Sequence, residues 1–488
     1  MRTSPVLLLS ILLIAAPAIV LAQAGQPPQK GAPKNEPPPP GVSDDPFPQP
    51  VLASDGLITV RAVEFATIPD FTGAPARMML LSDEPGTRRM FVNDMRGPLY
   101  TVSRDGKQVA LYLDINATEW NVRVQSQGSE RGFQSFAFHP DFARSGAPGF
   151  GKFYTYTDTT NTEPTPDFVP LGGNNTHDMV LLEWTAKDPA AAAYDGGAPR
   201  ELIRIEHPFA NHNGGQIAFN PLAKQGTPEY GLLYIGSADG GSGGDPMDMA
   251  QNMASIFGKI LRIDPLGKNS KNGKYGIPAG NPFVKDASAL PEIYALGLRN
   301  PQRFTWDPRN GNMFVADIGQ NTVEEVSIIR AGGNYGWNDW EGSYKFFGRQ
   351  GVYLENKRSD KKVTYPVVEY GQPDPLFMPN SAVTMGAVYR ATEIKALTGL
   401  LLFGDNPSGE VFYINADKLP NGGQDPIRRI LFEDGGAPKT LLQLIKQKNE
   451  AQGRKPATRA DLRFGVGANG EIFLLNKGDG TIRRLAPK

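Results

Sequence analysis

The chain has 488 residues, which is enough for one large domain or two smaller ones. Its 50 basic and 51 acidic side chains nearly cancel, so it lacks the basic excess that binds nucleic acid. The absence of cysteine excludes disulfides, zinc–thiolate sites, iron–sulfur clusters and covalently attached c-type haem.

Residues 1–24 are typical of a secretory signal peptide. Arg2 precedes an apolar run over residues 6–21, and small residues follow at Ala22 and Ala24. The alternative is an uncleaved membrane anchor, but the run of about 16 residues is short for a membrane span. We therefore expect a periplasmic or secreted protein with no membrane span after cleavage.

Residues 25–55 are rich in proline and polar side chains. Such a segment buries too little apolar surface to fold alone, so it is predicted to be a disordered or polyproline linker. The folded domain is then expected over residues 56–488.

The folded part is predicted to be all-β. Glycine (55) and proline (43) are abundant, and short apolar runs recur in units of three strands. The middle strands of these units are expected at residues 90–94, 153–156, 232–235, 313–317, 400–404 and 471–475. Six such modules predict a six-bladed β-propeller, in which a strand at residues 57–63 completes the last blade and closes the ring. The alternatives are a β-sandwich or two unrelated β domains.

The third module carries the most informative polar cluster. The segment Asn211-His-Asn-Gly-Gly-Gln216 leads into a strand, and the next strand ends in a glycine run that contains Asp239. Because these strands are neighbours, His212 and Asp239 are predicted to lie close together. A neutral imidazole can accept a proton in a reaction, and a carboxylate can orient it. The alternative is that His212 is a structural histidine.

The same glycine run, residues 236–245, lacks the phosphate-binding motifs GxGxxG and GxxxxGK[ST]. Asp239, Asp245 and Asp248 either bind a hard cation or hold turns.

Two further segments have the composition of a binding site. Arg299 and Asn300 stand before a proline that keeps the chain extended, where an arginine can hold an anion or a developing oxyanion. Gly319 and Gln320 follow the middle strand of the fourth module, and their backbone carbonyls would suit Ca²⁺.

Several segments, in one order, resemble the glucose/sorbosone dehydrogenase family. They include NHNGGQIAFNP, YIGSADGGSGGDP, YALGLRNPQRFTWDP and ADIGQNTVEEVSII. The family comprises soluble sugar dehydrogenases that use pyrroloquinoline quinone, and the hedgehog-interacting-protein-like proteins share its propeller. The resemblance extends from about residue 60 to the C-terminus.

The resemblance implies roles around the reacting atoms. His212 matches the general base that takes the sugar hydroxyl proton, and Asp239 matches the carboxylate that supports it. Arg299 and Asn300 match residues that contact the quinone, with Gln302 beside them.

The resemblance also implies a cofactor site. Gly319 and Gln320 match the positions whose carbonyls bind the calcium ion, and Glu324 matches a nearby acidic residue. Arg390 falls near a cationic position that pairs with a cofactor carboxylate. The chain departs from the glucose-oxidising type at residues 404–410, where the family places arginines and this sequence has none.

The first hypothesis is an exported aldose dehydrogenase that uses calcium and pyrroloquinoline quinone and passes electrons to a separate soluble or membrane acceptor. The second is a non-catalytic propeller that binds a sugar or a protein, which the missing arginines favour. The third is a metal-dependent propeller lactonase, which would need a central cluster of carboxylate and amide ligands.

Overall fold

Strands dominate the fold, as the sequence predicts. The computed structural model describes residues 39–51, 54–87, 89–162, 164–348, 351–377 and 380–488. The predicted signal peptide and the first part of the predicted linker lie outside these ranges. The α-helix of the described part, α1 (Leu441–Ala451), is short, and no described helix is long and apolar enough to cross a membrane.

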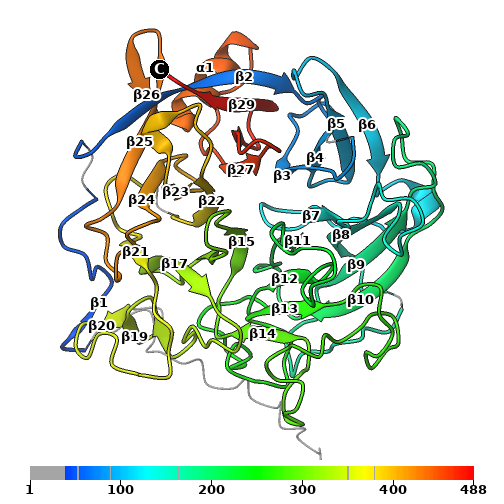
Figure 1. Cartoon of the computed structure of the whole chain (residues 1–488). Helices are drawn as coiled ribbons and strands as arrows, with labels where there is room; N and C mark the ends of the chain where they lie inside the picture. The colour runs from blue at the N-terminus through cyan, green and yellow to red at the C-terminus, as the bar shows by residue number, and fades with distance from the viewer. Residues whose placement is uncertain (1–38, 52–53, 88, 163, 349–350, 378–379) are drawn as a thin grey trace, which may run out of the picture.

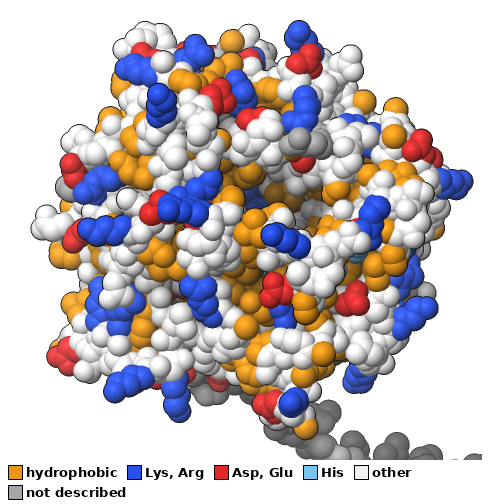
Figure 2. Space-filling model, viewed as in Figure 1, with side chains coloured by type: hydrophobic (Ala, Val, Ile, Leu, Met, Phe, Trp, Pro, Cys, Tyr) orange, Lys and Arg blue, Asp and Glu red, His pale blue; other side chains and the backbone are white. Residues whose placement is uncertain are grey.

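The sheets are arranged around a centre (Figure 1). The strands nearest to that centre are β3 (Met78–Asp83), β7 (Phe133–Phe138), β11 (Ile217–Phe219), β15 (Pro301–Trp306), β22 (Val383–Tyr389) and β27 (Arg463–Val466). We call them the inner strands. The surface is hollowed near the centre of the ring on the face seen in Figure 2.

Antiparallel strands follow each inner strand outward. After β3 come β4 (Met90–Asp94), β5 (Pro98–Val102) and β6 (Val109–Asp114); after β7 come β8 (Lys152–Thr159), β9 (His177–Thr185) and β10 (Arg200–His207). After β11 come β12 (Leu233–Ser237), β13 (Lys259–Ile263) and β14 (Ile293–Leu296); after β15 come β16 (Met313–Asp317), β17 (Val323–Ile329) and β21 (Val368–Gly371). After β22 come β23 (Leu400–Asp405), β24 (Val411–Asn415) and β25 (Arg428–Asp434), with β26 (Ala437–Lys439) beside β25; after β27 come β28 (Ile472–Leu475) and β29 (Thr481–Ala486).

The two ends of the described chain close the ring. Strand β2 (Ile58–Thr67) pairs antiparallel with β29, as predicted for residues 57–63, and parallel with β25. Strands β27 and β3 also pair, in parallel, so a thirteen-stranded sheet extends from β22 to β6. Backbone hydrogen bonds therefore join the last strand of the chain to an early one.

The prediction of an unpacked linker is wrong for the described residues before β2. Strand β1 (Val42–Ser43) pairs with β20 (Val352–Tyr353), which continues into β19 (Tyr344–Phe346) and β18 (Trp340–Glu341). Phe47 packs edge-on against Tyr344 with ring centroids 5.7 Å apart, and Val51 is buried. The segment is ordered because its few apolar side chains find partners in the ring.

Apolar clusters between adjacent sheets form the core. In one of them the rings of Phe153 and Trp184 stack, with centroids 6.1 Å apart, and both side chains are fully buried. Each such ring contributes roughly 1.5–3 kcal/mol by leaving water. Helix α1 adds Leu441 and Ile445 to the cluster beside β22 and β27, and Thr440 caps its N-terminus. The core thus fixes the sheets and leaves polar residues where the inner strands begin.

Candidate active site

His212 lies just before the inner strand β11, and both of its backbone polar groups are held. Its N–H donates to the Glu130 carboxylate (2.7 Å), and its carbonyl accepts from Nε2 of His207 (3.0 Å). Its φ of 58° lies in the left-handed region, which is unfavourable for a residue other than glycine. The imidazole is therefore positioned by a constrained backbone, and its side chain is only 6% exposed.

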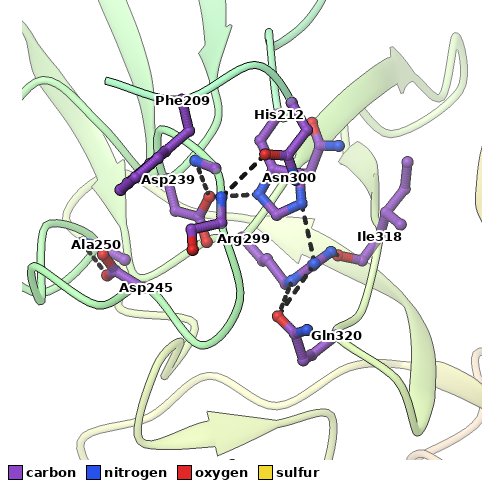
Figure 3. A network of polar contacts seen from close by, with 12 residues as sticks. Phe209, His212, Asp239, Asp245, Ala250, Arg299, Asn300, Ile318 and Gln320 are labelled. Carbon is purple, nitrogen blue, oxygen red and sulfur yellow. Dashed lines mark hydrogen bonds and ion pairs between the residues drawn. The ribbon is translucent and has the colours of Figure 1, made fainter. Parts of the chain in front are cut away.

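Asp239 contacts the His212 ring. The two residues lie close together, as predicted from their places at the ends of neighbouring strands. Oδ1 of Asp239 lies 2.5 Å from His212 Nδ1 (Figure 3). Oδ2 accepts from the Trp337 indole N–H at 2.9 Å. Burial acts to raise the pKa of this carboxyl, but the neighbouring His212 ring and the Arg299 guanidinium lower it overall. An ionised Asp239 keeps a proton on Nδ1 and directs the Nε2 lone pair of His212 away from it.

Arg299 donates a hydrogen bond to that lone pair. Its Nη2 lies 2.9 Å from His212 Nε2, and because a guanidinium only donates, the ring nitrogen is the acceptor. Nη1 donates to the Ile318 carbonyl (2.8 Å), while Nε and Nη2 both reach Oε1 of Gln320 (3.2 and 3.1 Å). The guanidinium carbon also lies 5.6 Å from the centroid of the Trp337 ring. The structure thus brings His212, Asp239 and Arg299 into one network (Figure 3).

The backbone beside Arg299 is fixed by a buried carboxylate at the end of β16. The two oxygens of Asp317 accept the N–H groups of Arg299 (2.9 Å) and Asn300 (2.6 Å). Burial raises the pKa of the Asp317 carboxyl to about 7. Asn300 then presents a buried side-chain oxygen that has no hydrogen-bond partner among the described residues. Such an oxygen is a place where a ligand can donate. Gln302, two residues further, is buried on β15.

The loop after β16 turns around one carboxylate oxygen. Oε1 of Glu341 accepts the backbone N–H groups of Gln320, Asn321, Thr322 and Val323 at 2.8–3.2 Å. No described residue donates to the carbonyl of Gly319 or Gln320. A methyl group at Gly319 would lie 1.7 Å from the Val323 carbonyl oxygen, so glycine is required there. The loop offers two carbonyl oxygens, which are ligands of the type that Ca²⁺ prefers.

Glu324 supports this loop from its buried side. Its Oε2 accepts from the N–H groups of Gly319 (3.3 Å) and Val383 (2.9 Å), and its Oε1 accepts from Gln372 (2.7 Å). Burial raises the pKa of the Glu324 carboxyl to about 8. Both oxygens are occupied, so the structure uses Glu324 to join the loop to β22.

The structure does not bring Arg390 to this cluster. Arg390 follows the end of β22, whose first residue Val383 is the one that contacts Glu324. Arg390 stands seven positions after Val383 along this strand, which is roughly 23 Å at about 3.3 Å per residue. Its guanidinium pairs with Asp307 (2.6 Å) and Asp417 (2.7 Å), and Asp307 follows the far end of β15. Arg390 therefore joins two strand ends on the side opposite His212.

The segment at residues 404–410 is acidic, in keeping with its lack of arginine. Asp405 is fully buried and accepts from the hydroxyls of Ser381 (2.5 Å) and Ser408 (2.6 Å). Burial raises the pKa of the Asp405 carboxyl. Glu410 pairs with Arg429 at 2.8 Å. This segment supplies no unpaired cation for an anionic ligand.

Asp245, at the end of the glycine run, supports a turn of the backbone. Asp245 accepts from the N–H groups of Met249 (2.9 Å) and Ala250 (2.8 Å), and burial raises its pKa to about 7. Among the described residues no three histidine or acidic side chains gather as a metal site. The carboxylate cluster that a propeller lactonase would need is therefore not found in the described part of the chain.

Sequence reasoning missed four supporting residues: Glu130, Asp317, Trp337 and Glu341. Each acts on a segment far away in sequence. Trp337 lies just before β18, and Glu341 is the last residue of that strand. The sequence around Trp337, Gly332-Gly-Asn-Tyr-Gly-Trp337, sets aromatic rings beside glycines, which suits stacking or packing.

Known proteins resemble this chain both in sequence and in fold. The family model for glucose/sorbosone dehydrogenase matches residues 73–421. The HIPL2 protein of Arabidopsis thaliana is 30% identical over 366 residues, which is 68% of this chain and 51% of the relative. The Hedgehog-interacting protein of Mus musculus is 26% identical over 371 residues, 68% of this chain and 47% of that protein. The chain thus spans about half the length of these relatives.

Among solved structures, the PQQ-bound aldose sugar dehydrogenase from Streptomyces coelicolor superposes with a TM-score of 0.55. The match covers 88% of this chain and 98% of that one at 19% identity. At this identity the likeness shows the propeller fold alone.

Proposed function

The chain belongs to the glucose/sorbosone dehydrogenase family, and from that premise we propose that it oxidises an aldose sugar at the anomeric carbon. In this reaction the sugar loses a hydride from C1 and a proton from the C1 hydroxyl, and becomes a lactone. Calcium-bound pyrroloquinoline quinone is the proposed hydride acceptor, and a separate soluble or membrane acceptor then takes the electrons. We also propose six blades and a periplasmic or secreted location.

The observation that carries this proposal is the contact series Asp239–His212–Arg299. Asp239 keeps the proton on Nδ1, so Nε2 is the atom of His212 that can take a proton from the sugar. The resulting imidazolium would be stabilised by the ionised Asp239, which the Trp337 N–H holds in place. Arg299 donates to Nε2, so the sugar hydroxyl has to replace it there.

The donor set on this wall of the site fits a calcium-bound quinone. The Gly319 and Gln320 carbonyls would hold the ion, and Asn300 and Gln302 would meet the quinone beside Arg299. When bound, the quinone would supply the hydride acceptor, and Ca²⁺ would act as the Lewis acid that polarises it. The chain's own part is to orient the sugar, take its proton at His212 Nε2 and offer positive charge at Arg299.

The opposite wall fits less well. Arg390 follows the end of β22 that is remote from His212, where it pairs with Asp307. Residues 404–410 carry the buried acids Asp405 and Glu410 and no arginine. We therefore expect weaker quinone binding than a site with those arginines would give, since the cofactor is a tricarboxylate.

Reconstitution tests the proposal. Purified protein is mixed with Ca²⁺ and pyrroloquinoline quinone, and both dye reduction with a panel of aldoses and thermal unfolding are measured. The expected result is turnover with at least one aldose and a rise in melting temperature that requires both additions. If the protein shows no turnover and no thermal shift at millimolar quinone, the dehydrogenase proposal is overturned.

The same acidic wall, and the cover that Arg299 places on His212, favour a second candidate: a propeller that binds a sugar or a protein without redox chemistry. Its expected result is saturable binding of an aldose to the protein, with no dye reduction at any quinone concentration. A His212→Ala variant separates the two candidates, because it loses turnover in the first and has no turnover to lose in the second.

A further inference from the structure

Two arginines on the inner strands are buried without a paired carboxylate. Arg303 on β15 and Arg463 at the start of β27 are each 3% exposed. Two other buried arginines of the described chain contact carboxylates: Arg204 lies 2.9 Å from Asp178, and Arg483 lies 2.6 Å from Asp479. The acid nearest to Arg463 in sequence, Asp461, instead binds Arg459 at 2.7 Å.

The guanidinium of Arg303 extends into the centre of the ring. Its Nη1 donates to the Gln302 carbonyl (2.7 Å), and its Nη2 donates to the carbonyls of Met79 on β3 (3.0 Å) and Gln134 on β7 (3.2 Å). These acceptors belong to three different inner strands. The side chain therefore reaches from β15 to the backbone of β3 and β7.

Arg463 lies at the same level. Strands β27 and β3 pair in parallel with Gly465 opposite Leu81, so two residues earlier Arg463 stands level with Met79. Met79 is one of the residues whose carbonyl Arg303 reaches. Arg463 Nη1 donates to the Leu462 carbonyl at 2.8 Å. Arg463 thus starts from the layer that the Arg303 guanidinium reaches, and its charge acts on Arg303.

Acidic side chains balance this positive charge only in part: burial lowers the pKa of Arg463 by more than Asp461 and Glu130 act to raise it. The Nε of Arg303 and the Nε of Arg463 are both buried without an acceptor in the described chain. Burial lowers the pKa of Arg463 to about 10, and burial together with the Arg463 charge lowers the pKa of Arg303. Burying a charge without a counter-charge is costly, and carbonyl dipoles offset only part of that cost.

We propose that a small inorganic anion of the size of chloride binds between Arg303 and Arg463 inside the ring. A water molecule would satisfy the two Nε–H groups but would cancel no charge. Carbonyls already take both terminal nitrogens of Arg303, so one donor from each guanidinium suits a compact monovalent ion better than a branched carboxylate. The ion would link β15 to β27 through these two arginines, and on β15 Arg303 follows Gln302 directly.

The anion dependence of stability tests this site. Thermal unfolding of the full chain is followed in sodium chloride and in sodium methanesulfonate at constant ionic strength. The melting temperature is expected to rise with the logarithm of chloride concentration, as mass action requires for a ligand of the folded state. Arg303→Met and Arg463→Met are expected to lose this dependence. Arg483→Met is the matched control, since its partner is a carboxylate; it should lower the melting temperature and keep the dependence.

Crystals of the unmodified protein soaked in bromide give a second measurement that does not rely on variants. An anomalous peak between the two guanidinium groups is expected. Equal melting temperatures in the two salts, a chloride dependence that survives in both Met variants, or no bromide between the arginines would each overturn the proposal.

Discussion

Arg299 donates to Nε2 of His212 at 2.9 Å, the same nitrogen that would have to accept a proton from a substrate. The other ring nitrogen is committed to Asp239. Since Nδ1 carries the proton and Nε2 accepts from Arg299, the site holds its base in the correct tautomer with both ring nitrogens in contact with the chain. Ligand entry therefore has to separate Arg299 from His212.

Replacing Arg299 by methionine should uncover His212. Diethylpyrocarbonate, which modifies unprotonated imidazole, is expected to label His212 several-fold faster in Arg299→Met than in the wild type. Turnover with quinone should fall about 10²-fold, because a donor that stabilises developing negative charge is lost. Arg131→Met is the control, since Arg131 donates to the nearby Ala210 carbonyl and not to the ring. Equal labelling of both variants would contradict the cover seen in the structure.

The Asp239→Asn variant tests the support under the base. An amide has one accepting oxygen where the carboxylate has two, so its NH2 group would face either the His212 Nδ1–H or the Trp337 N–H, and neither donor can accept from it. We expect kcat to fall about 10²–10⁴-fold, the range for loss of effective acid–base catalysis. Unfolding free energy should fall by about 1–3 kcal/mol, since a buried donor loses its acceptor.

A matched change separates catalysis from packing in that result. Trp337→Phe removes only the indole donor to Asp239 and keeps a ring beside Phe346, whose centroid lies 4.8 Å away. Its kcat should lie between those of the wild type and Asp239→Asn. If Trp337→Phe matched the wild type and Asp239→Asn lost only stability, Asp239 would have no role in positioning His212.

The proximity of His212 and Asp239 followed from the sequence because both flank neighbouring strands, and strand pairing brings such positions together. The inner and middle strands were likewise predictable from short apolar runs. The outer strands β6 and β25 were less legible, since their half-exposed patterns resemble those of loops.

Arg390 shows where a motif match fails. The match fixes a position in sequence, whereas a strand carries its two ends to opposite faces of the ring, and Arg390 follows the wrong end of β22. Glu341 shows the converse failure. Nothing in its sequence surroundings indicates that one of its oxygens accepts four amides of a loop 18–21 residues earlier.

That relationship predicts a large effect from Glu341→Ala. Four backbone donors would lose their common acceptor, so we expect unfolding free energy to fall by about 2–4 kcal/mol, as for loss of a buried hydrogen-bond network. The proposed calcium ligands sit in this loop, so the calcium-dependent thermal shift should also disappear. Urea unfolding and calorimetry measure the two effects. Glu355→Ala, at an exposed carboxylate, is the control and should change neither.

Glu324 makes a prediction about pH. Burial raises the pKa of its carboxyl from 4.5 to about 8, so the folded chain binds this proton more tightly than the unfolded chain does. Between these values the folded state holds more protons, and its stability contribution is therefore present at pH 4.5 and lost as pH rises through about 8. Glu324→Gln cannot titrate. Its melting temperature should fall less than that of the wild type between pH 5 and pH 8.5.

The same variant decides whether Glu324 touches the proposed calcium ion. Both of its oxygens accept hydrogen bonds from the chain, and a glutamine can keep Gly319 and Val383 on its oxygen while Gln372 reverses its amide. We therefore expect Glu324→Gln to retain the calcium-dependent thermal shift at pH 7. Loss of that shift with the loop still resistant to protease would show that the carboxylate ligates the ion directly, and that its contacts to the loop are secondary.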